Sequence, residues 1–394
     1  PERVLLGPTH RLEAQSLLAS AGALAIALGV ALMFAWNLIR MRRAVTTARA
    51  QARSAEARAK ELGSYRLVSK LGTGGMGEVW RAEHRLLARE AAIKIVRAEA
   101  LRDPSYAPRI RERFRREAQT LAAMRSRHTT ALYDYGVTDD GTFFYVMELL
   151  DGLDLDRVVR LHGAQPAARV IQLLAQACQS LAEAHDAGLL HRDIKPANLM
   201  MCRAADEVDV VKLLDFGIVH TITEPLAPAH ELVSLPGTDT DSGRLTAAGS
   251  TVGTPGYIAP EQAIGVAVDA RADLYALGCV AWWLLAGNEV YPRPSEEAAI
   301  RAHAQEPVPA LRPRVRGWLP DALDELVRAL LAKSPADRPR DARAVIAALR
   351  AIEIPAEHAW TEADAQAWWA EYQPVAKPLP TGPGAGQMIF ARRE

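Results

Sequence analysis

Apolar and polar residues divide the chain into an apolar run, a basic stretch and a long region of mixed patterns. Residues 17–39 read LLASAGALAIALGVALMFAWNLI and contain no charged side chain. A helix of that length spans ~34 Å, close to the ~30 Å hydrocarbon core of a bilayer. Trp36 lies near one end of the run, where an indole favours the membrane interface. The pattern therefore predicts one transmembrane helix over 17–39.

Two other interpretations of the apolar run are a buried core helix and a cleavable signal peptide. A core helix of this length would seldom lack a charge, and a signal peptide carries its basic residues before the apolar run. Here residues 40–60 hold seven basic side chains and one acidic, whereas 1–16 hold two of each. The positive-inside rule then predicts an extracytoplasmic stub over 1–16 and places everything after residue 39 in the cytoplasm.

Residues 40–62 are rich in Ala, Arg and Glu and contain no Pro, which predicts a basic juxtamembrane helix or linker. A plain solvated linker helix would have the same composition. Within the apolar run, Ala21, Ala25 and Gly29 repeat at four-residue spacing. Such a stripe lets helices pack closely and is compatible with a homodimer, although Ala-rich segments also produce it by chance.

The region that follows begins with strand patterns and continues with helical ones. Strands are predicted at 65–70, 78–82, 91–96 and 143–149. Helices are predicted at 109–124, 167–187, 274–285, 322–331 and 342–351. A β-rich start and an α-rich remainder indicate an α+β domain over 63–350, with an N-lobe over about 63–150 and a C-lobe over about 151–350.

Two segments lack such patterns or stand apart from them. Residues 221–243 are rich in Pro, Thr, Asp and Ser, which predicts a mobile loop. A tail over 351–394 contains three tryptophans, and its segment 361–372 predicts a short amphipathic helix with a threonine cap. The tryptophans indicate docking, either on the chain's own C-lobe or on a partner. The tail ends in a Pro/Gly-rich stretch over 374–386, which predicts an unstructured terminus.

The composition is that of a globular protein, with 49% hydrophobic and 24% charged residues. It excludes a wholly disordered or collagenous chain. The 47 basic and 47 acidic residues cancel, so the chain lacks the global basic field of many nucleic-acid binders, and we expect no nucleic-acid partner. Three widely spaced cysteines, Cys178, Cys202 and Cys279, favour free thiols over disulfides or a zinc site. Because the sequence starts with Pro1, we expect a fragment, a processed product or an open-ended gene.

A glycine-rich motif, GTGGMG over 72–77, lies between two predicted strands. Glycines let backbone amides approach a polyphosphate closely, because no Cβ intervenes. The motif alone is weak evidence, since a dinucleotide-binding turn or a plain hairpin competes with it. A dinucleotide-binding turn needs a helix directly after the last glycine, whereas residues 78–82 look like a strand. The pattern favours a hairpin that covers phosphates.

Lys94 lies on an apolar strand between Ile93 and Ile95. A charge on one face of a sheet needs a phosphate or carboxylate partner. Glu117, on the next predicted helix, is a candidate carboxylate. A lysine that points into solvent from an edge strand is the alternative.

Three further motifs follow in order: HRDIKPAN over 191–198, DFG over 215–217 and GTPGYIAPE over 253–261. Together with the glycine motif and Lys94, they make the chain resemble the eukaryotic-like (Hanks-type) serine/threonine protein kinases, specifically the bacterial membrane-anchored group. The resemblance covers residues 65–350. It implies the bilobal protein kinase fold, here preceded by one transmembrane helix.

The resemblance implies a role for each residue that matches a motif. The residues expected to cover the ATP phosphates are Gly72, Thr73, Gly74, Gly75, Met76 and Gly77. Lys94 is expected to hold the α- and β-phosphates and to pair with Glu117 in the active state. Asp193 should accept the proton of the substrate hydroxyl, and Lys195 should steady the γ-phosphate. Asn198 and Asp215 are expected to bind Mg²⁺, with Mn²⁺ as a substitute.

The resemblance also places the adenine site and the structural supports. The residues expected around adenine are Val79, Ala92 and Met200, with Met147 as the gatekeeper and Glu148 and Leu150 offering backbone hydrogen bonds. Asp273 matches the aspartate that steadies the catalytic loop. Arg338 matches the arginine that pairs with Glu261.

Arg192 precedes the expected base, and in the family this arginine marks kinases that activation-loop phosphorylation switches on. Thr246 fits best as the phosphorylated residue, Thr251 is second, and loop hydroxyls that are merely solvated are the alternative. Thr254 matches the threonine that faces the substrate. Ala91 and Ile194 depart harmlessly from the family pattern, whereas the insert 221–243 leaves the resting conformation of the activation loop open.

The implied function is that of an ATP-dependent serine/threonine kinase acting on protein substrates in bacterial signalling. The implied location is the bacterial inner membrane, crossed once, with the kinase domain in the cytoplasm. A pseudokinase would predict loss of Lys94, Asp193 or Asp215, and all three are present. A phosphotransferase for small molecules is disfavoured by Lys195 and by the peptide-binding segment 253–261.

Overall fold

The structure is a computed structural model, and it describes residues 33, 61–74, 77–96, 107–138, 142–216 and 254–372. Several predictions fall outside these residues: the stub 1–16, all of 17–39 except Met33, the basic stretch 40–60, Gly75, Met76, the insert 221–243, Thr246, Thr251 and the end 374–386. The chain divides into two compact units, Pro1–Glu61 and Leu62–Glu394, and nearly all of the elements below belong to the second. No helix in the described part is long and apolar enough to cross a membrane.

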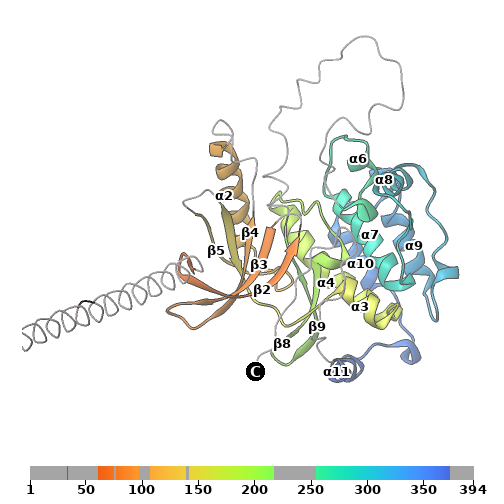
Figure 1. The fold of residues 1–394 in the computed structure, drawn as a ribbon. Helices are drawn as coiled ribbons and strands as arrows, with labels where there is room; N and C mark the ends of the chain where they lie inside the picture. The colour runs from red at the N-terminus through yellow and green to blue at the C-terminus, as the bar shows by residue number, and fades with distance from the viewer. Residues whose placement is uncertain are drawn as a thin grey trace, which may run out of the picture. The chain divides into compact units, whose positions relative to one another are not determined.

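The first lobe is a six-stranded sheet with one long helix beside it (Figure 1). Its strands are β1 (Glu61–Leu62), β2 (Tyr65–Gly74), β3 (Gly77–His84), β4 (Glu90–Val96), β5 (Leu132–Val137) and β6 (Phe143–Met147). They lie in the order β1-β2-β3-β4-β6-β5, and the pairings from β2 to β5 are antiparallel. The helix is α2 (Ala107–Ala123).

Strand β6 shows why this sheet forms where it does. Its sequence FFYVM is aromatic and apolar throughout, and all five side chains are buried. Successive residues of a strand point to opposite faces. Phe143, Tyr145 and Met147 therefore join the main core, whereas Phe144 and Val146 join a smaller cluster on the other face.

Helix α2 contacts the main-core face through Phe114. The ring of Phe114 lies 4.4 Å from that of Phe143 and 6.0 Å from that of Tyr135. Such tilted and edge-to-face ring contacts stabilise the packing beyond what the burial of apolar area contributes. These contacts attach the helix that carries Glu117 to the sheet that carries Lys94.

The second lobe is mainly helical and contains a small antiparallel sheet. The sheet consists of β7 (Gly152–Asp154), β8 (Leu199–Ala204) and β9 (Glu207–Leu213). The helices are α3 (Leu155–His162), α4 (Ala167–Asp186), α6 (Pro260–Ala263), α7 (Arg271–Ala286), α8 (Glu296–Gln305), α9 (Asp321–Leu330), α10 (Ala342–Arg350) and α11 (Glu362–Glu371).

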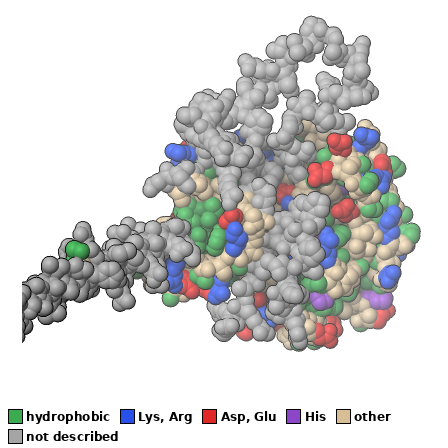
Figure 2. All heavy atoms as spheres, in the orientation of Figure 1, with side chains coloured by type: hydrophobic (Ala, Val, Ile, Leu, Met, Phe, Trp, Pro, Cys, Tyr) green, Lys and Arg blue, Asp and Glu red, His purple; other side chains and the backbone are tan. Residues whose placement is uncertain are grey.

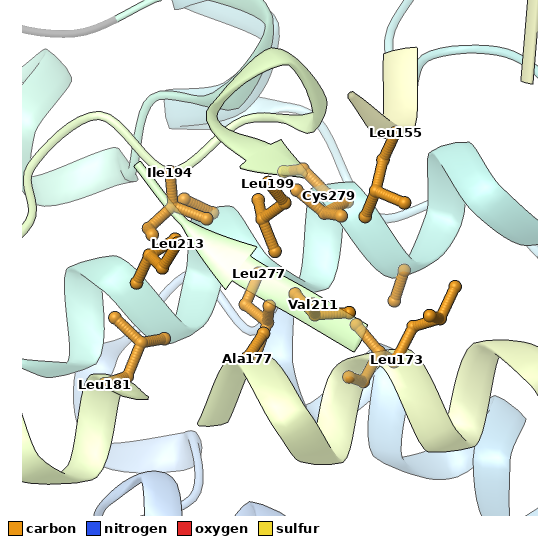
Figure 3. Packing of buried hydrophobic residues seen from close by; sticks show 14 of the residues in the cluster. Leu155, Leu173, Ala177, Leu181, Ile194, Leu199, Val211, Leu213, Leu277 and Cys279 are labelled. Carbon is orange, nitrogen blue, oxygen red and sulfur yellow. The ribbon is translucent and has the colours of Figure 1, made fainter. Parts of the chain in front are cut away.

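Helix α7 forms the centre of the second lobe. Every residue from Ala272 to Leu285 is buried, as expected for a helix that is apolar on all sides. Gly278 allows a close approach of α9, because a Cβ there would lie 2.8 Å from the Cβ of Leu330. Figure 3 shows the adjoining core, to which α4 contributes Ala177 and Leu181 and α7 contributes Leu277.

The same core holds the loop that carries the predicted catalytic residues. Ile194, directly after Asp193, is 1% exposed and lies among Leu199, Leu213 and the side chains of α4 (Figure 3). An apolar side chain buried in this way anchors the backbone on both sides of it. The loop is therefore fixed by packing as well as by hydrogen bonds.

The tryptophan-rich tail forms a helix and docks on the chain's own second lobe, beside the β8–β9 hairpin (Figure 1). Thr361 caps α11, as predicted, by accepting a hydrogen bond from the backbone N–H of Asp364 over 3.2 Å. The indoles of Trp360 and Trp369 donate to the two carboxylate oxygens of Asp209, over 2.9 and 2.8 Å. The prediction that the tryptophans dock on the chain's own C-lobe, rather than on a partner, is confirmed for Trp360 and Trp369.

Basic and acidic side chains are mixed over the described surface of the face in Figure 2, in keeping with the balanced charge of the sequence. The three cysteines are buried and free, which confirms the prediction of free thiols.

The predicted strands and helices are confirmed, with ends shifted by a few residues. Strands β2 and β3 extend further than predicted because they continue into the glycine-rich turn. The sequence patterns missed the strands β1, β5, β7, β8 and β9 and the helices α3, α6 and α8.

Candidate active site

Strands β2 and β3 bring the glycine-rich motif close to Lys94. Gly74 lies opposite Gly77 at the end of this hairpin. Gly77 has a φ of +141°, and a Cβ on it would lie 1.9 Å from the carbonyl oxygen of Ile95, so only glycine fits. Val79, two residues further along β3, pairs directly with Lys94 of β4.

Lys94 reaches across to the segment that follows β9. Its Nζ lies 2.7 Å from Oδ2 of Asp215, and both side chains are largely buried, at 10% and 14% exposed. The structure thus brings together two residues that lie more than a hundred positions apart in the sequence. Among the described residues Lys94 pairs with Asp215, and its pairing with Glu117, expected in the active state, stays a prediction.

Tyr145 is a member of the site that the sequence analysis missed. It lies on β6 directly opposite Lys94, and its hydroxyl donates to Oδ1 of Asp215 over 2.7 Å. The available signal was a tyrosine in the middle of an otherwise apolar buried strand, since a buried phenol usually has a hydrogen-bond partner.

Charges in this cluster are set by burial and by the groups around them. Burial opposes ionisation of Asp215, but the Lys94 charge and the hydrogen bonds from Lys94 and Tyr145 outweigh it, so the pKa of this carboxyl lies below its ordinary value. Burial and the Asp215 charge raise the pKa of Tyr145 well above its ordinary value. The carboxylate therefore stays ionised and the phenol stays protonated near neutral pH.

The loop over 191–198 brings Asp193, Lys195 and Thr254 into one cluster. Lys195 Nζ lies 2.7 Å from Oδ2 of Asp193 and donates to Oγ1 of Thr254 over 2.8 Å. The Thr254 hydroxyl in turn donates to Oδ1 of Asp193 over 2.8 Å. A carboxylate, an ammonium and a hydroxyl from segments about sixty residues apart thus meet.

Asn198 connects this cluster to the one around Asp215. Its Nδ2 donates to the backbone oxygen and to Oδ2 of Asp193, over 2.7 and 3.0 Å. Its backbone oxygen accepts from the N–H of Leu214, the residue before Asp215, over 2.9 Å. Hydrogen bonds and ion pairs, together with the peptide bond between Leu214 and Asp215, therefore link Lys94 and Asp215 to Asn198 and Asp193.

The comparisons with known proteins agree with this arrangement. A family model described as the protein kinase domain matches residues 65–348. The chain is 36% identical over 293 residues to the serine/threonine-protein kinase pkn3 of Myxococcus xanthus, which covers 73% of the chain and 50% of pkn3. It is 38% and 39% identical to the serine/threonine-protein kinases PknB of Mycobacterium leprae and Mycobacterium tuberculosis, over 70% of the chain and 40% of each PknB.

The chain belongs to the protein kinase family. It has the bilobal kinase fold, with a β-sheet N-lobe and a helical C-lobe. The matched part spans half or less of the length of these relatives.

Within this kinase domain, five of the residues predicted around adenine belong to the main core. Val79, Ala92, Met147, Leu150 and Met200 are all buried. Ala92 of β4 pairs directly with Met147 of β6, which puts the expected gatekeeper beside the strand of Lys94. A small pocket next to it is lined by Met147, Tyr145, Asp215 and Leu121 of α2, among others.

Glu148, the first residue after β6, has both its backbone N–H and its side chain engaged within the protein. The N–H donates to the carbonyl of Ala131 over 3.0 Å, and Oε1 lies 2.7 Å from Nζ of Lys212. The backbone carbonyl of Glu148 is therefore the group that can accept a hydrogen bond from a ligand at this position.

Asp273 fixes the backbone of the catalytic loop, as predicted. Its Oδ2 accepts from the N–H of His191 over 2.9 Å, and its Oδ1 accepts from the N–H of Arg192 over 2.8 Å. Arg192 has a φ of +64°, a backbone conformation that costs energy in a non-glycine residue. The two hydrogen bonds to one buried carboxylate hold the loop in that conformation.

The predicted pair between Arg338 and Glu261 is also confirmed. Nη1 and Nη2 of Arg338 donate to Oε1 and Oε2 of Glu261 over 2.6 and 2.7 Å. The two side chains are 0% and 5% exposed. This bidentate pair ties the segment after Thr254 to the C-terminal part of the second lobe.

The donor atoms of the site fit a hard divalent cation. Nδ2 of Asn198 is used within the loop, which leaves its amide oxygen as the atom able to bind a metal. Each oxygen of Asp215 accepts one partner and has a second lone pair. Amide and carboxylate oxygens are the ligands that Mg²⁺ prefers.

Proposed function

We propose that this chain is an ATP-dependent serine/threonine protein kinase that transfers the γ-phosphate of ATP to hydroxyls of protein substrates. The observation that carries the proposal is a network of hydrogen bonds and ion pairs, completed by the Leu214–Asp215 peptide bond. It joins Lys94, Asp215, Asn198, Asp193, Lys195 and Thr254. Phosphoryl transfer requires charge neutralisation and alignment rather than covalent help from the protein. The network brings two ammonium groups, two carboxylates and a side-chain amide together, which supports a role in such alignment.

The residues of the network have distinct roles in this proposal. Gly72, Thr73, Gly74 and Gly77 belong to the hairpin that covers the phosphates, and Gly75 and Met76 complete its motif. Lys94 holds the α- and β-phosphates. Asn198 and Asp215 hold Mg²⁺, or Mn²⁺ in its place, which when bound neutralises charge on the phosphates.

In the transfer step, the oxygen of a serine or threonine hydroxyl forms a bond to the γ-phosphorus. The bond between that phosphorus and the β,γ-bridging oxygen breaks, and ADP leaves. Asp193 accepts the hydroxyl proton on its carboxylate, and Lys195 steadies the γ-phosphate. A positioned base of this kind contributes ~10²–10⁴-fold to the rate.

Contacts around Thr254 favour a protein acceptor over a small molecule. The Thr254 hydroxyl bridges Lys195 and Asp193, so the substrate-facing segment is attached directly to the expected base. The Arg338–Glu261 pair holds the other end of that segment in place. A segment held beside the base at both ends suits the binding of a peptide, which a kinase for small metabolites does not require.

A transfer assay with the full chain in detergent tests this proposal. The chain is incubated with γ-labelled ATP, Mg²⁺ and a generic protein acceptor, beside a Lys94→Met variant. We expect label on phosphoserine and phosphothreonine with the original chain and its loss with the variant. Equal labelling in both would refute the proposed function, and label confined to small molecules would refute the protein acceptor.

The proposal extends to anchoring and domain limits. Residues 17–39 cross the bacterial inner membrane once, 1–16 lie outside, and 40–62 lead to the cytoplasmic kinase domain over 63–350. The support is the uncharged run and the excess of basic residues after it. The chain should sediment with membranes and lose that property when 17–39 are deleted. Crosslinking in the membrane tests whether Ala21, Ala25 and Gly29 pair two copies.

The proposal also includes activation by autophosphorylation at Thr246 or Thr251. Its support is Arg192, which directly precedes the base and offers a cation to a phosphate nearby. Phosphosite mapping of active protein should find one of the two threonines modified. Finding neither modified would reject this form of regulation.

A further inference from the structure

The antiparallel register of β4 and β6 places Lys94 and Tyr145 directly opposite each other. Side chains of directly opposed residues lie on the same face of a sheet. Here Nζ of Lys94 lies 5.8 Å from the centre of the Tyr145 ring. The two side chains therefore extend together from the N-lobe toward the segment that carries Asp215.

Both side chains end on the same carboxylate, one on each oxygen. Lys94 contacts Oδ2 of Asp215 and the hydroxyl of Tyr145 donates to Oδ1, each over 2.7 Å. Two donors at separate oxygens fix the rotation of a carboxylate, whereas one donor alone leaves it free to turn. Tyr145 is 3% exposed, so water cannot easily replace its hydroxyl.

The backbone at Asp215 and the side chain that follows it are also fixed. The φ of Asp215 is +52°, in the left-handed region that non-glycine residues adopt at an energetic cost. Phe216, the next residue, is buried and its ring lies 4.8 Å from that of His191. Packing thus holds the chain after Asp215, and the hydrogen bond from Tyr145 holds the carboxylate itself.

We propose that Tyr145 is a positioning residue that orients the Asp215 carboxylate for the divalent cation of a metal–nucleotide complex. The inference rests on the proposed function, because it assumes that Asp215 binds that cation. Oδ1 can keep the hydrogen bond and also bind a metal, since a carboxylate oxygen has two lone pairs. Hydrogen bonds that orient metal-binding side chains typically change metal affinity by about 10–100-fold.

Two alternatives make different predictions. If Tyr145 only fills space beside Met147 and Leu121, its ring matters and its hydroxyl does not. If the hydroxyl competes with the metal for Oδ1, removing it strengthens metal binding. A Tyr145→Phe variant separates the three cases, because it keeps the ring and removes only the donor.

The test measures binding rather than catalysis, with the full chain in detergent. Mn²⁺ is titrated by electron paramagnetic resonance at a saturating concentration of a non-hydrolysable ATP analogue, and the affinity for the analogue is also measured without metal. For Tyr145→Phe we expect Mn²⁺ affinity to fall about tenfold, with metal-free analogue affinity within about twofold of the original. Thermal unfolding of both proteins checks that the variant is folded.

Tyr135→Phe is the matched control. Tyr135 lies on β5 opposite Tyr145, but its hydroxyl is not one of the two donors that the described residues offer to Asp215. The Tyr135→Phe variant should therefore have the same Mn²⁺ affinity as the original chain. Unchanged or tighter Mn²⁺ binding in Tyr145→Phe would overturn the inference. Failure of the original chain itself to bind Mn²⁺ with the analogue would instead overturn the proposed function.

Discussion

The indole N–H of Trp369 donates to Oδ1 of Asp209 over 2.8 Å, which joins the last described helix to strand β9. Asp209 also accepts two hydrogen bonds from Arg169, over 2.8 and 2.7 Å, and the Arg169 side chain is completely buried. The rings of Trp360 and Trp368 lie 4.6 and 4.2 Å from the Arg169 guanidinium. The tail therefore covers a buried ion pair and belongs to the folded kinase unit.

Replacing Trp369 by alanine should consequently destabilise the kinase unit. The change removes a buried aromatic side chain and one of the donors to Asp209, and buried Trp→Ala changes cost about 3–5 kcal/mol. The free energy of unfolding, measured with denaturant, checks this. Gln366→Ala, at an exposed position of the same helix, is the control and should change stability by at most about 0.5 kcal/mol. Equal effects of the two changes would mean that the tail is not part of the unit.

Asp273 should affect turnover through the loop that it holds. In Asp273→Asn, the side-chain NH₂ group replaces one of the two oxygens that accept from the loop. One backbone N–H of the loop then has no acceptor, which destabilises the loop conformation by about 1–3 kcal/mol. We expect kcat to fall by about 10–100-fold with a smaller change in the KM for ATP.

The matched control for Asp273 is Asp269→Asn, whose carboxylate contacts the partly exposed Arg271 nearby. Steady-state kinetics of both variants separate the two positions. A kcat for Asp273→Asn equal to that of the control would contradict the role of Asp273 in holding the loop.

The buried cap of helix α3 should make stability depend on pH. Asp154 accepts from the N–H of Arg157, and burial raises the pKa of its carboxyl to about 7. The folded protein therefore holds a proton on Asp154 at pH values where the unfolded chain, with an ordinary pKa of about 4, has lost it. The protonation of Asp154 therefore contributes to the free energy of unfolding. The contribution is complete below pH 4 and is lost as pH rises toward 7.

An Asp154→Asn variant tests that contribution, because asparagine caps helices as well as aspartate and does not ionise. Unfolding free energies from pH 4 to 7 should fall less steeply with pH in the variant than in the original chain. Identical pH profiles would show that Asp154 does not titrate in this range.

The HRDIKPAN motif indicated which residues of the loop lie near one another, because the motif keeps them together in sequence. Asp193, Lys195 and Asn198 share one loop, and its geometry follows from eight consecutive residues. The family resemblance, rather than the hydrophobic pattern, predicted the Arg338–Glu261 pair. It also predicted that Asp273 supports the loop. Thr361 was recognisable as a cap because capping depends on local sequence.

Contacts set by tertiary packing were beyond such prediction. The bond between Tyr145 and Asp215 depends on the register of β4 against β6, which no single motif encodes. The contact between Lys94 and Asp215 joins residues of two separate motifs, so neither motif alone encodes it. The tryptophans indicated docking, but nothing in the sequence marked Arg169 and Asp209 as their receptor.

The most direct test of the whole account is the rate of phosphate transfer by an Asp193→Asn variant. Single-turnover transfer from labelled ATP to a protein acceptor is compared with that of the original chain and of Asp206→Asn, a change at an exposed turn. We predict a rate lower by about 10²–10⁴-fold for Asp193→Asn, with ATP affinity within about twofold and Asp206→Asn unaffected. A rate for Asp193→Asn within about twofold of the original, with the nucleotide equally well bound, would contradict the account.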